Sequence, residues 1–312
     1  MRFEGIEVRE VVVGVEPCPE FFKSFVVIDT ATSDAVVVDP GPAAGYEALV
    51  SELERLGVKK SLRGVVATHI HLDHYGAGPR LCLELGVKLY VHPKGVKHVV
   101  DPSRLWQSAL EVLGSEAEAL GKPDPLPVEL VVGVGDGETL ALGSLDFVFI
   151  HTPGHAPHHL VAVCRGIAFV GDAIGGYDRE LDVVFPTSPP GLRLEPYVES
   201  MERLYRGVRA RATGFTHMCL AHGFTEFIER HARQLLAWIE TIDSLGGEKP
   251  SIETLASRDP ELARYLSRAR CDRVLKSFER SLEAIHEEWT RIRSSGGGEE
   301  VIRRLRSMIV GW

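Results

Sequence analysis

Three histidines and an aspartate within six residues set the strongest limit on the fold of this 312-residue chain. His69, His71, Asp73 and His74 follow residues 65–67, an apolar run that is typical of a buried strand. Because residues two apart in an extended strand point to the same side, His69 and His71 can bind one ion. The glycine-rich segment 75–79 must then turn the chain, which brings Asp73 and His74 toward a second ion. Such imidazole and carboxylate ligands suit zinc, iron or manganese.

Three later apolar segments also end in residues that can bind metals. Residues 147–150 lead to a T-P-G-H segment that ends at His155, residues 168–170 lead to Asp172, and residues 218–221 lead to His222. Each of these candidates has a glycine beside it, which allows a close approach of the backbone. His217 is the rival of His222 for the last position. We favour His222, because it directly ends the apolar segment and precedes a glycine.

The order of the predicted elements indicates an α/β protein with a helical C-terminal region. Short runs bounded by turn residues predict strands at 11–15, 25–29, 35–39, 64–68, 88–92, 145–151, 160–164, 167–171 and 218–221. Helical spacing predicts helices at 45–56, 103–120, 196–209, 225–245, 251–258, 260–270, 272–293 and 299–309. We therefore predict a catalytic domain over residues 1–228 and a helical region over residues 229–312, which serves packing or dimerisation.

Charge and composition narrow the class of protein. The net charge of −9 argues against a nucleic-acid partner, which normally needs a basic face. No segment approaches the roughly 18 apolar residues of a membrane span, and charges interrupt the N-terminal segment where a signal peptide needs an apolar run. The five cysteines lack C-x-x-C pairs, so we expect unpaired, buried thiols in a reducing cytoplasm. The absence of Asn and the presence of only two Gln indicate a thermophilic source.

The order of motifs resembles that of the metallo-β-lactamase superfamily. H-x-H-x-D-H, T-P-G-H, G-D and A-H-G follow one another at comparable separations over about residues 6–228. The resemblance implies a four-layer αββα sandwich, here with a C-terminal helical extension, and two divalent metal ions, with zinc preferred over iron or manganese. The first ion would be held by His69, His71 and His155, the second by Asp73, His74 and His222, and Asp172 would bridge the two.

In its ligand set the chain is similar to the glyoxalase II and lactonase members of this superfamily. We therefore expect a hydrolase in which two metal ions share one hydroxide, which attacks an ester, thioester, lactone or phosphodiester bond of a small-molecule substrate. Asp73 would orient this hydroxide and so act as the catalytic residue. Residues 173–178 depart from the glycine- and arginine-bearing stretch of glyoxalase II relatives, which argues against glutathione thioesters.

Two other classes of protein stay open. The first is a mononuclear iron oxygenase similar to the persulfide dioxygenases, which would bind about one metal ion and consume oxygen. The complete second ligand set argues against it. The second is a non-catalytic binding protein on the same fold, which would not hydrolyse generic esters even when loaded with metal.

Several residues near the predicted ligands have supporting roles in this interpretation. Asp39, at the end of a predicted strand, is expected to form hydrogen bonds rather than to bind metal. Two roles stay open for His158 and His159: one of them orients a ligand, or both serve ordinary packing. Substrate contacts are expected from Tyr75, Tyr177 and the segments 103–127 and 185–194.

Overall fold

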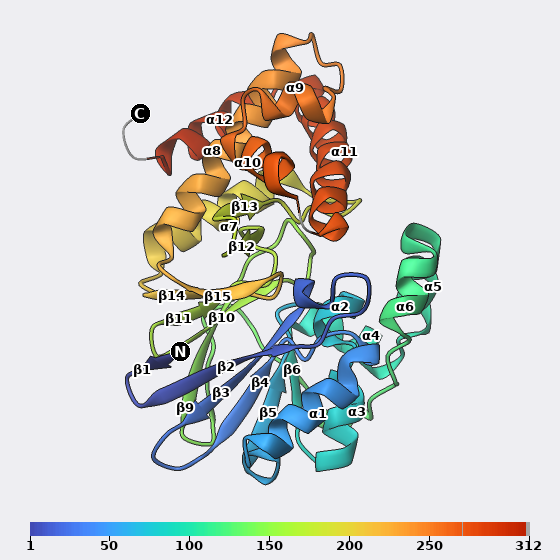
Figure 1. Ribbon diagram of the computed structural model, residues 1–312, viewed down its shortest axis with the longest axis vertical. Coiled ribbons are helices and arrows are strands. Elements are labelled where there is room, and N and C mark those ends of the chain that lie inside the picture. Colours follow the sequence, from blue (N-terminus) through green and yellow to red (C-terminus); the bar gives the residue numbers. More distant parts are fainter. Residues whose placement is uncertain (270, 310–312) are drawn as a thin grey trace.

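Two β-sheets pack face to face, and helices cover the outer face of each sheet (Figure 1). The computed structural model describes residues 1–269 and 271–309. Strands β1 to β4 of the first sheet pair antiparallel and β4 to β7 pair parallel, so the carboxyl ends of β4 to β7 meet at one edge. Its seven strands lie in chain order: β1 (Arg2–Phe3), β2 (Ile6–Val12), β3 (Lys23–Asp29), β4 (Ala35–Val38), β5 (Leu62–Val66), β6 (Leu89–Val91) and β7 (Val131–Gly133).

The second sheet is antiparallel except for the parallel pair of β11 and β14. Its six strands lie in the order β15 (Cys219–His222), β14 (Ala212–Phe215), β11 (Ile167–Phe169), β10 (Leu160–Cys164), β9 (Leu145–His151) and β8 (Thr139–Leu142). A small two-stranded sheet, β12 (Gly176–Asp178) and β13 (Val183–Phe185), lies between this sheet and the C-terminal helices (Figure 1).

The core between the sheets forms because side chains alternate along each strand. Val27 and Val36 from the first sheet pack in one cluster with Phe147 and Phe149 from the second, and all four are fully buried. Val26, which precedes Val27 in β3, belongs to another apolar cluster, which also contains the buried face of α1 (Tyr46–Arg55). Both faces of the central strands are thus covered, which confirms the predicted four-layer αββα sandwich.

The helices form the two outer layers and the C-terminal extension (Figure 1). Helices α1, α3 (Gly78–Leu85) and α4 (Pro93–Val100) cover the first sheet, and α7 (Leu194–Gly207) and α8 (Thr225–Ser244) cover the second. The extension continues with α9 (Ile252–Ala256), α10 (Pro260–Arg268), α11 (Asp272–Ser295) and α12 (Gly298–Ser307). The remaining helices are α2 (Leu72–Tyr75), α5 (Ser103–Leu113), α6 (Ser115–Leu120), η1 (Pro19–Phe21), η2 (Ala43–Gly45), η3 (Lys59–Ser61) and η4 (Val128–Leu130).

The predicted domain boundary between residues 228 and 229 falls within the first turns of α8 and stays a prediction. The helix predicted over 260–270 corresponds to α10, and its last residue lies outside the described residues. Within residues 1–269 and 271–309, no helix is both long enough and apolar enough to cross a lipid bilayer.

Two further differences from the predicted elements have local causes. Residues 103–120 form two helices rather than one, because Gly114 adopts φ 56° and ψ −127°, a conformation that favours glycine. Strand β14 was not among the predicted strands. Its four residues, Ala-Thr-Gly-Phe, are too few to show a period and contain a glycine, which weakens a strand pattern.

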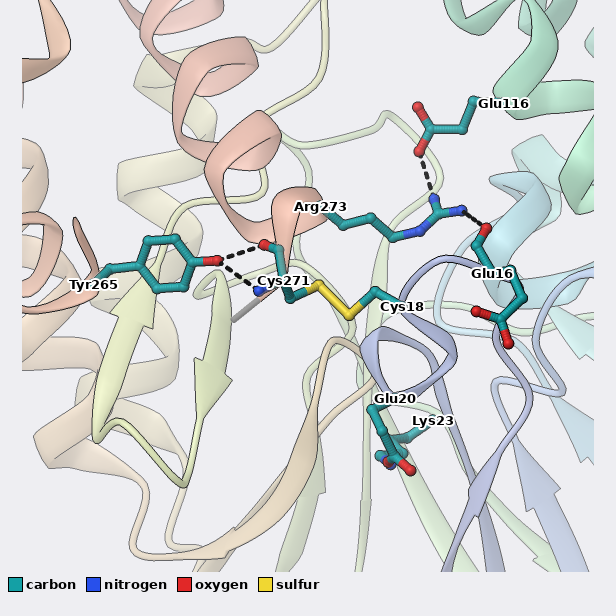
Figure 2. The surroundings of a disulfide bond; sticks show 8 residues. All are labelled: Glu16, Cys18, Glu20, Lys23, Glu116, Tyr265, Cys271 and Arg273. Atoms are coloured by element: carbon teal, nitrogen blue, oxygen red, sulfur yellow. Dashed lines mark hydrogen bonds and ion pairs between the residues drawn. A yellow bond between two sulfur atoms is a disulfide. The ribbon is translucent and has the colours of Figure 1, made fainter. Parts of the chain in front are cut away.

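A disulfide bond joins Cys18 to Cys271, which are 253 residues apart in sequence and have Cα atoms 5.9 Å apart (Figure 2). The prediction of unpaired cysteines is therefore wrong for these two, whereas Cys82, Cys164 and Cys219 are free and buried. The sequence could not show this pair, because the two cysteines meet only when the C-terminal helices fold back onto the loop before η1. The cysteine pattern consequently no longer supports a reducing compartment.

We predict that this disulfide contributes about 2–4 kcal/mol to the free energy of unfolding, because it restricts the unfolded chain. Thiol titration in denaturant should count three free thiols before reduction and five after it. Denaturant unfolding should have a lower midpoint with reductant than without, and the double variant Cys18→Ser/Cys271→Ser should be insensitive to reductant. Equal midpoints for oxidised and reduced wild-type protein would contradict the prediction.

Candidate metal centre

The first predicted motif lies in the connection between β5 and α2, at the edge where the parallel strands end. His71 has extended backbone angles, φ −70° and ψ 151°, and immediately precedes α2. Asp73 and His74 belong to this short helix, which begins at Leu72 and reverses the chain. The reversal thus starts within the motif rather than after it, and it brings all four candidate ligands to one place.

Four predicted ligands, His69, His71, His155 and Asp172, form a first cluster in which one donor atom of each lies within 4.8 Å of the others. His71 Nδ1 is 2.9 Å from His69 Nε2 and 3.1 Å from His155 Nε2. Asp172 Oδ2 is 3.1 Å from His155 Nε2. His155 follows β9 and Asp172 follows β11 of the second sheet, whereas His69 and His71 follow β5 of the first, so both sheets supply this cluster.

Asp73, His74 and His217 form a second cluster beside the first. The Nε2 atoms of both histidines are 3.7 Å from Asp73 Oδ2. Asp172 reaches this cluster too, since its Oδ1 is 3.1 Å from His217 Nε2 and its Oδ2 is 3.4 Å from His74 Nε2. The carboxylate of Asp172 therefore lies between the two clusters, where the predicted bridging ligand belongs.

The structure does not bring the predicted ligand His222 into either cluster, and His217 lies in the second cluster instead. β14 runs parallel to β11, so its carboxyl end and the following His217 lie at the same edge as Asp172. β15 runs antiparallel to β14 and pairs His222 with Ala212, at the opposite edge of the sheet. There His222 is exposed and its ring lies 5.6 Å from that of Phe3. The feature of the sequence that could have indicated His217 is strand β14, which ends shortly before this residue and was not predicted.

The donor atoms of the two clusters fit divalent cations. A neutral imidazole has one N–H, so nitrogens that face several other nitrogens cannot all be satisfied by hydrogen bonds. Asp39 accepts the Nδ1 proton of His74, so Nε2 is the nitrogen that is left to bind a cation; this Nε2 is buried and has no hydrogen-bond partner among the described residues. Imidazole lone pairs beside carboxylates are the ligands that zinc, iron and manganese use in proteins.

Burial and mutual charge set the protonation of the clusters. Burial lowers the pKa of His69 and His155 well below its usual value. Burial opposes the charge of Asp172 as well, but the neighbouring histidines outweigh it and hold the pKa of this carboxyl well below its usual range. Burial also opposes a charge on His74, yet the surrounding carboxylates raise the pKa of its imidazole well above the usual value. His69 and His155 are thus neutral and Asp172 is ionised, the forms that bind metal, whereas a cation that binds His74 displaces a proton.

Asp39 connects three segments of the site through one fully buried carboxylate. Its Oδ1 accepts from Thr68 N at 2.7 Å. Its Oδ2 accepts from Thr68 Oγ1 at 2.9 Å, His74 Nδ1 at 2.9 Å and Thr216 Oγ1 at 2.5 Å. The prediction that Asp39 acts through hydrogen bonds is confirmed. It ties the end of β4 to the histidine motif and to the residue before His217, and it orients one ligand.

His159 supports the bridging aspartate. Its Nε2 accepts from the backbone N–H of Asp172 at 3.1 Å, so its Nδ1 carries the proton and donates to Thr152 Oγ1 at 2.7 Å. Burial lowers the pKa of His159 to about 3, which keeps this tautomer neutral. Gly171 must precede Asp172, because a Cβ at this position would lie 2.4 Å from Thr68 Oγ1. Of His158 and His159, it is therefore His159 that supports a predicted ligand.

A cavity of about 270 Å³ opens over both clusters. Its walls come from η1, α5, α6, residues 187–190 and the first turns of α11. The predicted substrate segments 103–127 and 185–194 thus both reach it. The candidate ligands that line it are His71, Asp73, His155, Asp172 and His217.

Other parts of the cavity differ from the prediction. Tyr75 is fully buried and Tyr177 donates its hydroxyl to Asp182 at 3.0 Å, and neither lines the cavity. Arg273 and Arg280 of α11 do line it. No local sequence signal could place them there, since an amphipathic helix far along the chain gives no information about its neighbour.

Comparison with known proteins agrees with this geometry. The family model of the metallo-beta-lactamase superfamily matches residues 19–212. The chain is 32% identical over 177 residues to the metallo-beta-lactamase fold-containing protein ST1585 of Sulfurisphaera tokodaii, which is 55% of this chain and 66% of that protein. It is 29% identical over 174 residues to the hydroxyacylglutathione hydrolase GloC of Haemophilus influenzae, which is 54% of this chain and 74% of that protein. An uncharacterized protein of Aquifex aeolicus matches over 54% of its own length. The chain thus spans between half and two thirds of the length of this protein and of ST1585.

Solved structures show the same fold. The crystal structure of ST1585 superimposes with a TM-score of 0.69 at 24% identity, covering 91% of this chain and 98% of that chain. The metallo-beta-lactamase family protein TTHA1429 of Thermus thermophilus gives a TM-score of 0.61 at 20% identity, covering 94% of each chain. Because the family model matches more than half of the sequence and the fold agrees, the chain belongs to the metallo-beta-lactamase superfamily.

Proposed function

We propose that the protein is a dinuclear metal-dependent hydrolase of small-molecule esters, thioesters, lactones or phosphodiesters. The observation that carries this proposal is the position of Asp172 between two donor clusters that open into one cavity. Relatives named as a hydroxyacylglutathione hydrolase and a probable metallo-hydrolase support hydrolysis as the reaction type.

Seven residues of the chain would hold the two cations, with zinc preferred over iron or manganese. The first would be held by His69, His71 and His155 and the second by Asp73, His74 and His217, with Asp172 shared. A pair of bound divalent cations lowers the pKa of a shared water toward neutrality and polarises the substrate oxygen.

The chain's own residues orient and enclose the reaction. Asp73 lies at the cavity with its side chain 21% exposed, so its carboxylate can accept a hydrogen bond from the attacking water and direct it at the substrate. Asp39 holds His74 in one tautomer throughout, because Oδ2 accepts from Nδ1. Phe21 and Phe22 cover one side of the cavity with apolar rings, which limits the entry of bulk water.

We predict that chelation abolishes hydrolysis and that zinc, iron or manganese restores it, because the clustered imidazole nitrogens and carboxylates are the groups that bind these ions. Active protein should contain about two metal ions per chain by elemental analysis. A nitrophenyl carboxylic ester, a lactone and bis-nitrophenyl phosphate are the test substrates. A metal content near one with oxygen uptake would favour the mononuclear iron oxygenase, and no hydrolysis by the loaded protein would refute the proposal.

A matched pair of histidine variants tests the assignment of the seventh ligand. His217→Ala should lower kcat/KM and the affinity for the second ion by more than the ~10–100-fold expected for losing an outer-shell partner of a ligand. His222→Ala should leave both unchanged, because this side chain is exposed at the far edge of the sheet. Circular dichroism should confirm that both variants are folded. If the His222 variant were the inactive one, the assignment would be wrong.

A further inference from the structure

The cavity carries hydrogen-bond donors that the proposed reaction does not use. Ser188 is 3% exposed, lines the cavity, and its hydroxyl has no hydrogen-bond partner in residues 1–269 and 271–309. The adjacent Thr187 also lines the cavity, and within the same described residues its buried hydroxyl has no partner. A buried hydroxyl without a partner costs free energy, so a ligand that supplies an acceptor would be favoured here.

Two arginines of α11 line the same cavity. Arg273 is 8% exposed; its guanidinium donates to Glu116 Oε1 at 2.7 Å and to the carbonyl of Glu16 at 3.2 Å (Figure 2). Its Nε is buried and lacks a partner among the described residues. Arg280 is 43% exposed and pairs with the other oxygen of Glu116, and this is its single hydrogen bond within the part of the chain that the structure describes. Four of its five N–H groups therefore remain for a ligand.

The disulfide and Glu116 hold these arginines in place. Cys271 lies two residues before Arg273, so the bond to Cys18 anchors the first turn of α11 beside the loop that precedes η1 (Figure 2). The ring of Phe22 lies 5.4 Å below the guanidinium of Arg273. Two arginines against one glutamate leave one net positive charge, which matches a ligand with a single negative charge.

The remaining wall is apolar. Leu105, Ala109 and Val112 of α5 line the cavity, and Val112 is 57% exposed. A ligand that covers this wall needs an aliphatic or aromatic portion. The cavity therefore combines a metal centre, an apolar wall and a set of donors with one surplus positive charge.

We propose that the substrate is an ester-type compound with an apolar portion and a separate carboxylate, and that Arg280, Arg273, Ser188 and Thr187 bind this carboxylate. The proposal rests on the proposed hydrolytic function and names its substrate class. The planar fork of an arginine matches the two oxygens of a carboxylate, and the two hydroxyls donate to the same group. Arg280 is the main specificity-determining residue, because it retains the most free donors.

A matched pair of substrates tests the proposal. The 4-nitrophenyl monoester of adipic acid carries a free carboxylate, and its methyl ester is neutral but otherwise equal. Wild-type holoenzyme should prefer the anionic ester by about 10-fold or more in kcat/KM, and Arg280→Gln should lower this preference about 10-fold, mainly through KM. Ser188→Ala should lower it by less. Lys276→Gln, which removes a charge from an exposed position on the same helix outside the cavity, should change neither rate.

Binding provides a second readout that does not need turnover. The 4-nitroanilide of adipic acid should bind to wild-type protein in calorimetry, and about 10-fold more weakly to Arg280→Gln, with both variants checked for folding by thermal melting. If no ester is hydrolysed but this difference holds, the hydrolase proposal fails and the carboxylate site stands. Equal rates on the two esters in wild-type protein, an equal loss on both in the variant, or tighter binding of the corresponding phosphate compound would overturn the carboxylate assignment.

Discussion

The gathering of five imidazoles and two carboxylates in one place, most of them buried, is the constraint on which the rest of this structure depends. Burying so many polar groups costs free energy unless each has a partner, and several nitrogens here lie against other nitrogens. The chain keeps them together through Asp39, which accepts hydrogen bonds from three segments, and through His159, which accepts from the backbone of Asp172. These bonds orient the side chains but leave their cluster-facing nitrogens without suitable partners. A pair of cations would supply those partners. The sandwich itself can be understood as the frame that brings the ends of β5, β9, β11 and β14 to one edge.

The C-terminal helices do more than cover the second sheet. The first turns of α11 form one wall of the cavity, and the disulfide between Cys18 and Cys271 joins that wall to the loop before η1. Glu116 on α6 completes the connection by pairing with both cavity arginines of α11. The metal clusters thus come from the sandwich, whereas much of the surface that a substrate would meet comes from residues added to it. This division explains how one set of ligands can serve different substrates within a superfamily.

Much of the candidate site could be predicted from sequence, because its main parts are local. His69, His71, Asp73 and His74 lie within six consecutive residues, and His155 and Asp172 each follow a strand that is long or apolar enough to recognise. His217 was missed because the strand before it, β14, has only four residues and includes Gly214. Because β14 was not recognised, the apolar run before His222 was the stronger sequence signal for a ligand. β15 runs antiparallel to β14, however, and its direction carries His222 away from the site.

Sequence alone determined the α/β class, the position of the first metal-binding motif and the hydrogen-bonding role of Asp39, since each depends on short-range periodicity, turns and residue chemistry. The four-layer arrangement was implied by the resemblance to the superfamily. Tertiary structure alone decided that His217 and not His222 joins the site, that Cys18 meets Cys271, and that Arg273 and Arg280 face the cavity. These three outcomes depend on which strands pair, in which direction, and on where a helix packs after more than 200 intervening residues. Such contacts are set by the burial of whole faces against each other, and no local pattern of residues records them.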